Sequence, residues 1–215
     1  TSAYEDKLYR VDYNVSSLLP RSEGAYWDLG TNASWLTLQR DGILTGTPTN
    51  YDVGNYWVNL SITLDGEDFD YSNFTLTVHN VNDPPFINTI TLPDMYEDEP
   101  YSYRLIGQDI DIINDTLTWS METNASFIEM DPVTGNISGI AANEDVGTYW
   151  VHVELSDGKG GIDDVNMTLT VKNVNDAPYL VLPALDSAAT EDSPFSDTVR
   201  VVDIDIGDSL TLDLV

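Results

Sequence analysis

The chain is built from a unit of about 92 residues that occurs twice in full and a third time in part. The string NVNDPP at 80–85 returns as NVNDAP at 173–178, which is 93 positions later. At almost the same spacing, DVGNYWV at 52–58 returns as DVGTYWV at 145–151. So strong a repeat within 215 residues predicts tandem domains of ordinary size rather than one large domain.

The repeat sets the expected domain boundaries. Repeat 1 covers 1–83 and is short at its start, repeat 2 covers 84–176, and the beginning of repeat 3 covers 177–215. The third copy stops less than half way through a unit. We therefore expect these residues to be a segment of a longer array.

Apolar and polar residues alternate within each unit. In YWVNLSITL at 56–64, Val58, Leu60 and Ile62 share one face, while Trp57 and Asn59 lie on the other. Short alternating runs, broken by Gly, Pro, Asn and Asp and without a helical period, are typical of antiparallel β-sandwiches. We expect an all-β chain with about seven strands in each full unit.

The charge balance excludes two classes of partner. Asp plus Glu number 37 against 8 Lys plus Arg, which gives a formal net charge of −29. Nothing here could neutralise the phosphates of a nucleic acid or of an anionic membrane surface. The acidity indicates either a generally solvating surface, as in a salt-adapted organism, or carboxylates gathered into cation sites. The excess of Asp over Glu favours cation sites, because short carboxylates suit tight calcium loops.

Several common features are missing from the sequence. There are no cysteines, so neither disulfides nor thiolate metal sites are expected. No apolar run approaches the length of a membrane span, and the N-terminus lacks a basic-then-apolar signal. We expect no membrane contact within these residues, with any signal peptide or anchor lying outside them.

The inventory for catalysis is small. The chain has 2 His, and its paired carboxylates lie in loops that repeat rather than in one unique cleft. The sequence predicts that the chain is not an enzyme.

A run of motifs resembles the cadherin-like repeats of the dystroglycan type, which occur in surface proteins including prokaryotic ones. It consists of Gly42-x-x-x-Gly46-x-Pro48, then Asp-Val-Gly-x-Tyr at 52–56, an Asp-Gly pair and the Asn-Val-Asn-Asp-x-Pro linker. Repeat 2 lacks the proline at 140–142. The resemblance implies tandem Ig-like or cadherin-like antiparallel β-sandwiches with calcium bound where one repeat meets the next.

The linker differs from that of cadherins, which reads Asp-x-Asn-Asp-Asn-x-Pro. Asn80 replaces the first Asp and Pro84 replaces the last Asn, so one charge and one side-chain ligand are lost. The number of ions at each junction is therefore left open.

The resemblance implies a ligand set at each junction, since calcium takes six to eight oxygen ligands. At the first junction the implied ligands are Glu5, Asp52, Asn80, Asn82, Asp83, Asp109, Asp111 and Asp157, with Asn50 beside Asp52. At the second junction they are Glu97, Asp145, Asn173, Asn175, Asp176, Asp203 and Asp205, with Asn143 beside Asp145. Taken singly, Asp-Gly and Asn-Asp-Pro are ordinary turn and loop signals, so the argument depends on their joint recurrence.

Asn-x-Ser/Thr sequons are more frequent than chance predicts. They fall at Asn14, Asn32, Asn59, Asn73, Asn114, Asn124, Asn136 and Asn166. Either the chain is a secreted glycoprotein, or these strings belong to a Ser/Thr-rich β surface.

The function predicted from the sequence is a calcium-binding, calcium-rigidified structural or adhesion module. It would belong to a larger extracellular protein of the cell surface or surface layer. The expected host is a prokaryote, with an archaeon favoured. The expected partners are neighbouring repeats, other surface proteins or glycans.

An alternative function is a carbohydrate-binding accessory module with Trp57 and Trp150 as its platform, although such Trp side chains more often cover an adjacent strand. Homophilic adhesion is a third hypothesis.

Overall fold

We describe the chain from a computed structural model over residues 1–13, 25–64, 68–111, 115–181, 188–196, 198–205 and 208–213. The residues group into two compact units. The first comprises Thr1–Phe86, Gln108–Leu117 and Ser156–Asp163, and the second comprises Ile87–Gly107, Thr118–Leu155 and Asp164–Val215. Two loops that the repeat pattern assigns to repeat 2 thus belong with the first unit. The repeat boundaries at 83 and 176 stay a prediction.

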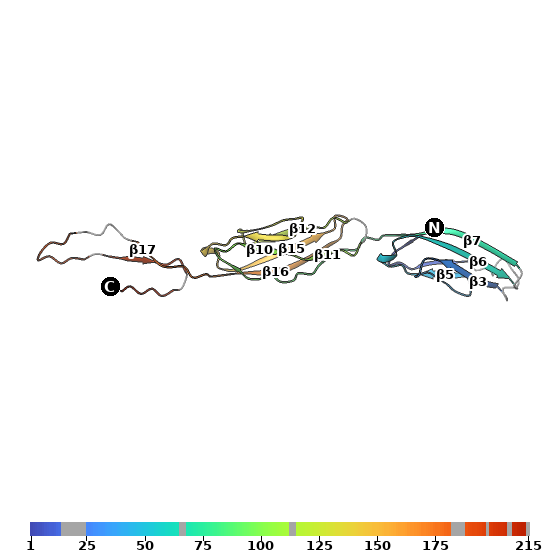
Figure 1. Ribbon diagram of the computed structural model, residues 1–215, viewed down its shortest axis with the longest axis horizontal. Helices are drawn as coiled ribbons and strands as arrows, with labels where there is room; N and C mark the ends of the chain where they lie inside the picture. Colours follow the sequence, from blue (N-terminus) through green and yellow to red (C-terminus); the bar gives the residue numbers. More distant parts are fainter. Residues whose placement is uncertain are drawn as a thin grey trace. The chain divides into compact units, whose positions relative to one another are not determined.

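Repeat 1 forms two sheets that face each other. Its elements are β1 (Ser2–Tyr4), β2 (Tyr9–Asp12), β3 (Ala25–Thr31), β4 (Thr37–Leu38), β5 (Ile43–Gly46), the 3-10 turn η1 (Asn50–Asp52), β6 (Gly54–Leu64) and β7 (Asp68–His79). One sheet has the order β1-β7-β6-β3 and the other the order β2-β5-β4. The long neighbouring strands β6 and β7 are drawn in cyan and green in Figure 1.

The apolar face of β6 builds the core of this sandwich as the alternation predicts. Val58 and Leu60 are buried, together with Leu44 of β5 and Leu76 of β7. Trp57 points the other way and is 55% exposed. Burial of alternate side chains between two sheets is the main stabilising contribution of such a fold.

The first strand of the repeat is the exception to antiparallel pairing. β1 runs parallel to β7, with Ser2 opposite Thr77 and Tyr4 opposite His79. A parallel pair cannot be closed by a tight hairpin, so β1 reaches β7 only after the chain has passed through both sheets. This pairing brings the residue after β1 to the start of the linker after β7.

Repeat 2 has the same arrangement. The strands and turn from Phe86 onward are β8 (Phe86–Ile87), β9 (Met95–Tyr96), β10 (Tyr101–Arg104), β11 (Gly107–Gln108), β12 (Thr118–Thr123), β13 (Ile128–Met130), β14 (Asn136–Gly139), η2 (Asn143–Asp145), β15 (Gly147–Ser156), β16 (Ile162–Lys172), β17 (Tyr179–Val181) and β18 (Arg200–Val202). The sheets are β12-β15-β16-β9 and β10-β14-β13, with a short β11-β8 pair, and β9 runs parallel to β16. The chain is therefore all-β, with tandem β-sandwiches.

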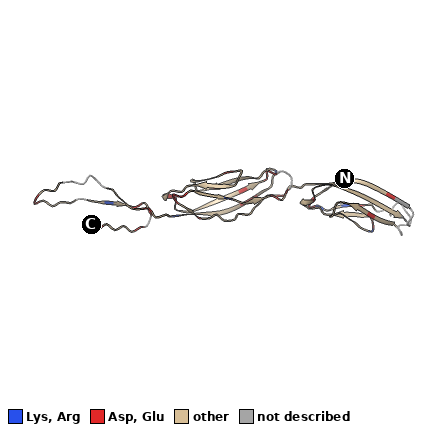
Figure 2. Ribbon diagram, in the orientation of Figure 1, with Lys and Arg blue, Asp and Glu red and all other residues tan. Residues whose placement is uncertain are grey.

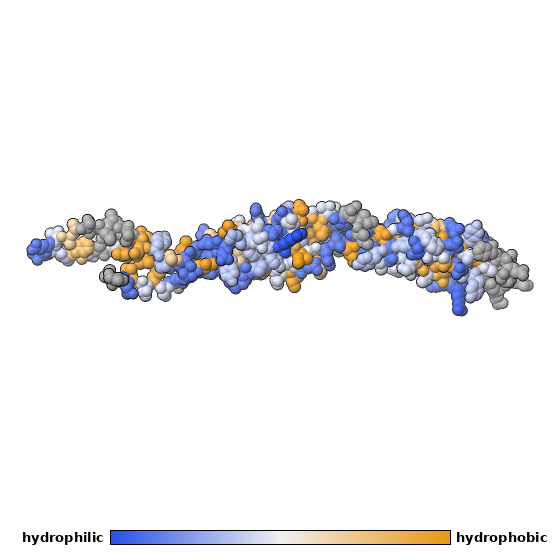
Figure 3. All heavy atoms as spheres, in the orientation of Figure 1, coloured by the Kyte–Doolittle hydropathy of each residue, from blue (hydrophilic) through white to orange (hydrophobic). Residues whose placement is uncertain are grey.

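The start of repeat 3 has one strand pair and no core among its described residues. β17 pairs with β18, while Tyr179, Leu180 and Phe195 are each more than half exposed. Hydrophobic atoms, drawn in orange in Figure 3, accordingly reach the surface near the C-terminus. Within the described ranges no helix is long and apolar enough to cross a membrane.

The glycines of the Gly-x-x-x-Gly motif let aromatic rings and backbone approach β5. Gly42 has φ of +84°, and a Cβ there would lie 2.9 Å from the Trp27 ring. A Cβ on Gly46 would overlap the carbonyl oxygen of Trp35, and Gly139 of repeat 2 faces the Phe127 carbonyl in the same way. The motif is thus a packing requirement of each sandwich.

We predict that Gly46→Ala lowers the free energy of unfolding by about 1–3 kcal/mol, because the added methyl group must displace the Trp35 backbone. Gly30→Ala is the matched control, since its Cβ would lie 3.4 Å from the Trp57 ring, which is ordinary contact. Its effect should stay within about 0.5 kcal/mol. Urea denaturation of the two variants measures the difference, and equal effects would contradict this packing.

Candidate metal centre

Glu5 is the buried carboxylate at the end of β1. Its backbone N–H donates to the His79 carbonyl at 3.1 Å, and the next residue, Asp6, turns the chain with φ of +55°. The Glu5 side chain is 0% exposed, and its Oε1 accepts the Val81 N–H at 2.5 Å. Its Oε2 has no hydrogen-bond partner among the described residues. The β1–β7 pairing therefore fixes this carboxylate against the linker.

Two further carboxylates converge on Glu5. Asp83 of the linker donates its N–H to Asp111 Oδ2 at 3.0 Å, and its own Oδ2 accepts the Asn50 amide at 2.6 Å. Ligand oxygens of Glu5, Asp83 and Asp111 all lie within 4.8 Å of one another, and we call these three residues the Glu5 cluster. All of these residues belong to the first compact unit.

A second group of carboxylates lies in the same unit. Oxygens of Asp109, Asp115 and Asp157 also lie within 4.8 Å of one another, and we call these residues the Asp115 cluster. Asn82 of the linker donates to Asp157 Oδ2 at 2.6 Å. The Asp111 N–H donates to Asp109 Oδ1 at 2.9 Å, so the Asp-x-Asp pair contributes one residue to each cluster.

The two clusters hold their charge differently. Burial raises the pKa of the Glu5 carboxyl above its ordinary value, the Val81 N–H opposes this, and Asp111 and Asp83 raise it further by repulsion. The Asn82 amide holds the pKa of Asp157 below its ordinary value, assisted by backbone N–H groups of the turn after it. The Asp157 carboxylate is therefore stabilised as an anion, while that of Glu5 is not.

The donor set fits a hard cation. The converging atoms are carboxylate oxygens, and no His or Cys lies in either cluster. Buried oxygens without a hydrogen-bond partner among the described residues include Glu5 Oε2, Asn80 Oδ1, Asp109 Oδ2 and Asp111 Oδ1. A buried oxygen left unpaired is costly, and a bound cation removes that cost.

Asp52 and Asp145 lie outside both clusters. Asp52 Oδ2 accepts the N–H and the hydroxyl of Thr49, each at 2.8 Å, and thereby closes η1. Asp145 Oδ2 accepts the Ala142 N–H at 3.0 Å in the equivalent turn η2. Each carboxylate thus stabilises its own turn, and Asn50 rather than Asp52 reaches the linker. A role for these two Asp residues as ligands stays a prediction.

The second linker repeats the backbone pattern of the first. Glu97 is 0% exposed and accepts the Val174 N–H at 2.6 Å, and the Asp176 N–H donates to Asp205 Oδ2 at 2.7 Å. Here the described carboxylates that converge are Asp203, Asp205 and Asp208. Asn175 donates to the Asp176 carbonyl, and Asn173 is exposed. The ligand set inferred for this linker stays a prediction.

The sequence did not predict that Asp115, its ion-pair partner Lys159 or Asp208 takes part in these sites. A signal for the two aspartates exists, because each directly precedes a Thr/Ser-Leu-Thr string, in NDTLTW and in GDSLTL. No comparable repetition marks Lys159.

Several sequon residues make side-chain hydrogen bonds to residues that are distant in the sequence. Asn59 Nδ2 donates to Asn73 Oδ1 at 2.6 Å across β6 and β7, and Asn32 and Asn124 accept the backbone N–H groups of Trp57 and Trp150. Asn136 and Asn166 also have side-chain partners. Asn14 and Asn114 lie outside the described residues. Glycosylation of the eight sequon residues stays a prediction, which intact-mass measurement of the native protein tests.

Comparison with known proteins is consistent with this architecture. A family model described as "Putative Ig domain" matches residues 84–172. Protocadherin alpha-3 of Homo sapiens is 30% identical over 151 residues, covering 62% of this chain. Protocadherin alpha-3 of Pan troglodytes matches equally well. This chain spans 16% of the length of these relatives.

Solved structures give the fold. The EC21-23 segment of human CDH23 matches with a TM-score of 0.61 at 18% identity, covering 90% of this chain and 72% of that one. The extracellular domain of Protocadherin GammaB4 matches with a TM-score of 0.56 at 19% identity, covering 85% and 34%. The fold is cadherin-like. The Glu5 and Asp115 clusters are therefore features of a cadherin-like, Ig-like β-sandwich chain.

We predict that Glu5→Gln stabilises the chelator-treated protein at neutral pH by about 1 kcal/mol, or about 4 °C in Tm. Glutamine keeps the acceptor for Val81 but removes a buried charge from beside Asp83 and Asp111. Because the folded-state pKa of Glu5 is raised, its stabilising contribution is present at low pH and is lost as pH rises through that pKa. The difference from wild type should therefore shrink on acidification.

Melting curves at several pH values measure this effect. Glu129→Gln is the control, because Glu129 is exposed on β13, and it should not change Tm measurably. A lower Tm for Glu5→Gln in chelator at neutral pH would show that the charge of Glu5 is satisfied without a cation.

Proposed function

We propose that this chain is a calcium-binding structural and adhesion module of a larger extracellular protein, with calcium rigidifying the linkers between repeats. The observation that supports this most is the Glu5 cluster. A fully buried carboxylate with one unpartnered oxygen faces two further carboxylates, and its pKa is raised by burial and by their charge. A divalent cation would remove the repulsion and fill the missing contact at once.

The chemistry of the donors favours calcium over other metals. Zinc and copper prefer nitrogen and sulfur ligands, and neither cluster offers any. Magnesium needs a compact octahedron and keeps much of its water, whereas calcium accepts many protein oxygens in irregular geometry. The carboxylates here come from several loops, which is the kind of ligand set that calcium tolerates.

A cation at these clusters would be coordinated by three separate segments of the chain and would hold them together. Glu5 and Asp83 come from 1–86, Asp109 and Asp111 from the loop after β11, and Asp157 from the turn after β15. The linker already contacts both loops, through the Asp83 N–H to Asp111 and the Asn82 amide to Asp157. When bound, the ion supplies the charge neutralisation, and the protein groups keep the linker extended and its donors in place.

The setting of the module is also a proposal. The relatives are protocadherins, and one similar solved structure is the extracellular domain of Protocadherin GammaB4, which supports a cell-surface location. The Gly-x-x-x-Gly-x-Pro and Asn-Val-Asn-Asp-x-Pro motifs support membership of the dystroglycan-type repeats, and a prokaryotic surface stays a prediction. The proposed partners are neighbouring repeats, other surface proteins or glycans. Figure 2 shows how few Lys and Arg residues stand among the acidic ones, which argues against nucleic acid.

A second candidate function is carbohydrate binding at Trp150. This side chain is 50% exposed and lines a hollow of about 490 Å³ with Trp119, Glu122 and Glu129. Thr123 and Asn124 hold its backbone on both sides, at 2.6 and 2.9 Å. An exposed aromatic ring beside acidic and hydroxyl groups is a usual way to bind a sugar. The equivalent Trp57 lies against Gly30, at the position where repeat 2 has Glu122.

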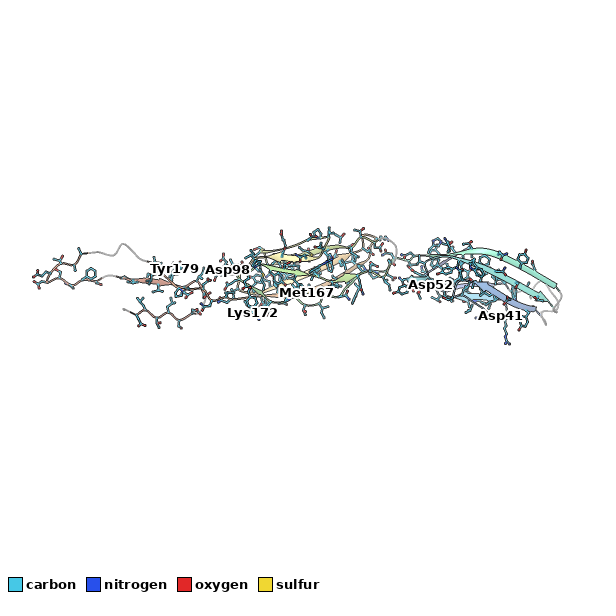
Figure 4. All side chains as sticks on the ribbon, viewed as in Figure 1. Asp41, Asp52, Asp98, Met167, Lys172 and Tyr179 are labelled. Atoms are coloured by element: carbon cyan, nitrogen blue, oxygen red, sulfur yellow. The ribbon has the colours of Figure 1, made fainter. Side chains whose placement is uncertain are left out.

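We predict that calcium at about 100 times its Kd stabilises the chelator-treated protein by about 2.7 kcal/mol, because it binds the folded state alone. Asp83→Asn should remove most of this gain, since it deletes a charge from the Glu5 cluster. Asp41→Asn is the matched control, because Asp41 is exposed and lies well away from Asp52 along repeat 1 (Figure 4).

Thermal melts with and without calcium, together with calorimetric titration, measure both effects. Asp41→Asn should keep the full gain of the wild type. A wild-type protein that shows neither heat of binding nor a rise in Tm at millimolar calcium would exclude the proposed function.

For the second candidate, we predict that Trp150→Ala abolishes any signal on a glycan array while Trp57→Ala preserves it. The physical reason is that Trp150 lies beside Glu122 and Glu129 in the hollow, whereas the Trp57 ring lies against Gly30, which has no side chain. If the wild-type protein binds no glycan on the array, carbohydrate binding is excluded and only the structural and adhesion function stands.

A further inference from the structure

We propose that the Lys159 ammonium is a tethered competitor for calcium at the Asp115 cluster, and that the Asp115 carboxylate becomes an ion ligand once this lysine has moved away. The inference rests on the proposed calcium function. It distinguishes the two clusters by assigning a protein cation to one of them.

Asp115 is a buried carboxylate with an unusual environment. Its side chain is 2% exposed, and neither of its oxygens accepts a hydrogen bond within the described part of the chain. Its ion-pair partner is Lys159. Oxygens of Asp109 and Asp157 lie within 4.8 Å of its ligand atom. A buried anion without hydrogen-bond donors needs a cation, which here is either the ammonium or a metal ion.

The turn after β15 holds Lys159 at this position. The Lys159 N–H donates to Asp157 Oδ1 at 2.7 Å, and the Gly161 N–H donates to the same oxygen at 2.9 Å. Backbone and ammonium of one residue therefore contact two different carboxylates of the cluster. Because the backbone contact does not involve the side chain, the ammonium can leave without disturbing the Asp157 turn.

This ion pair differs from the others in the described residues. The acidic partners in the pairs of Arg10, His152 and Lys172 have exposed side chains, at 45%, 57% and 43%. Among the ion pairs of the described ranges, Lys159 alone has a buried carboxylate as its partner. In repeat 1 the equivalent of Asp157-Gly158-Lys159 is Asp65-Gly66-Glu67, which lies outside the described residues, so the lysine is not part of the repeated pattern.

The lysine can be displaced. Its side chain is 43% exposed, and a four-carbon stem lets the ammonium move into water at small conformational cost. Calcium has twice the charge and accepts oxygens of all three carboxylates together. No ion pair to Glu5, Asp83 or Asp111 is found across the described ranges. Calcium should therefore fill the Glu5 cluster first and the Asp115 cluster at higher concentration.

The test is calorimetric titration of calcium into the complete 215-residue chain after chelator treatment. Lys159→Gln should tighten the weaker binding step by about 5-fold, the size expected when a partly exposed ion pair stops competing. Lys159→Arg keeps the charge and should leave the step weak. Arg10→Gln is the matched control for net charge, because its partner Asp12 is exposed, and it should change affinity by less than about 2-fold.

A further variant tests the role of Asp115. In the Lys159→Gln background, Asp115→Asn should abolish the weaker step and leave the tighter one, because the Glu5 cluster is unchanged. Melting in chelator should show Lys159→Gln less stable than Arg10→Gln, since it exposes Asp115 to uncompensated repulsion from Asp109 and Asp157.

The outcomes separate this inference from the proposed function. If wild type binds calcium and Lys159→Gln matches Arg10→Gln, the tethered competitor is wrong while the calcium function stands. If Lys159→Gln alone gains a binding step, the Lys159 ammonium is confirmed as a competitor. It then occupies the Asp115 cluster in the wild-type protein. If no variant binds calcium, both proposals fail.

Discussion

The hydrogen bond from the Val81 N–H to the buried Glu5 carboxylate is the contact on which the rest of the site depends. It joins the end of β1 to the first residues of the linker, and the parallel β1–β7 pairing makes it possible. The same contact recurs between Glu97 and Val174 after β9. A carboxylate fixed in this way cannot turn toward water, so its charge must be balanced by whatever lies beside the linker.

That constraint explains the opposed environments of the two clusters. Burial and neighbouring charge raise the pKa of Glu5, whereas Asn82 and the turn N–H groups lower that of Asp157. The buried Glu5 carboxylate thus has a single N–H donor, whereas Asp157 has several donors and Asp115 has a lysine as its ion-pair partner. The linker contacts both through consecutive residues, so its conformation is coupled to the charge balance on either side.

Much of the sandwich follows from local patterns. Alternation placed Val58 and Leu60 inside and Trp57 outside, and the glycine motif lies where Trp27 and the Trp35 carbonyl need space. The sequence also pointed to Glu5, Asp83, Asp109, Asp111 and Asp157 by resemblance, and they lie in the two clusters. Asp52 differs, because its carboxylate caps η1 through the Thr49 N–H. Asn50 is the residue of this turn that contacts the linker. A turn-closing Asp and a ligand Asp have the same sequence pattern.

The sequence by itself determined the repeat, the strand period and the surplus of negative charge, because each is a property of neighbouring residues along the chain. Only the tertiary structure decided which carboxylates share a charge environment. Asp115 and Lys159 are 44 positions apart and meet because two loops fold against the linker of the first unit. Electrostatic coupling depends on distance in space and on burial, and neither can be read from a repeat of period 92.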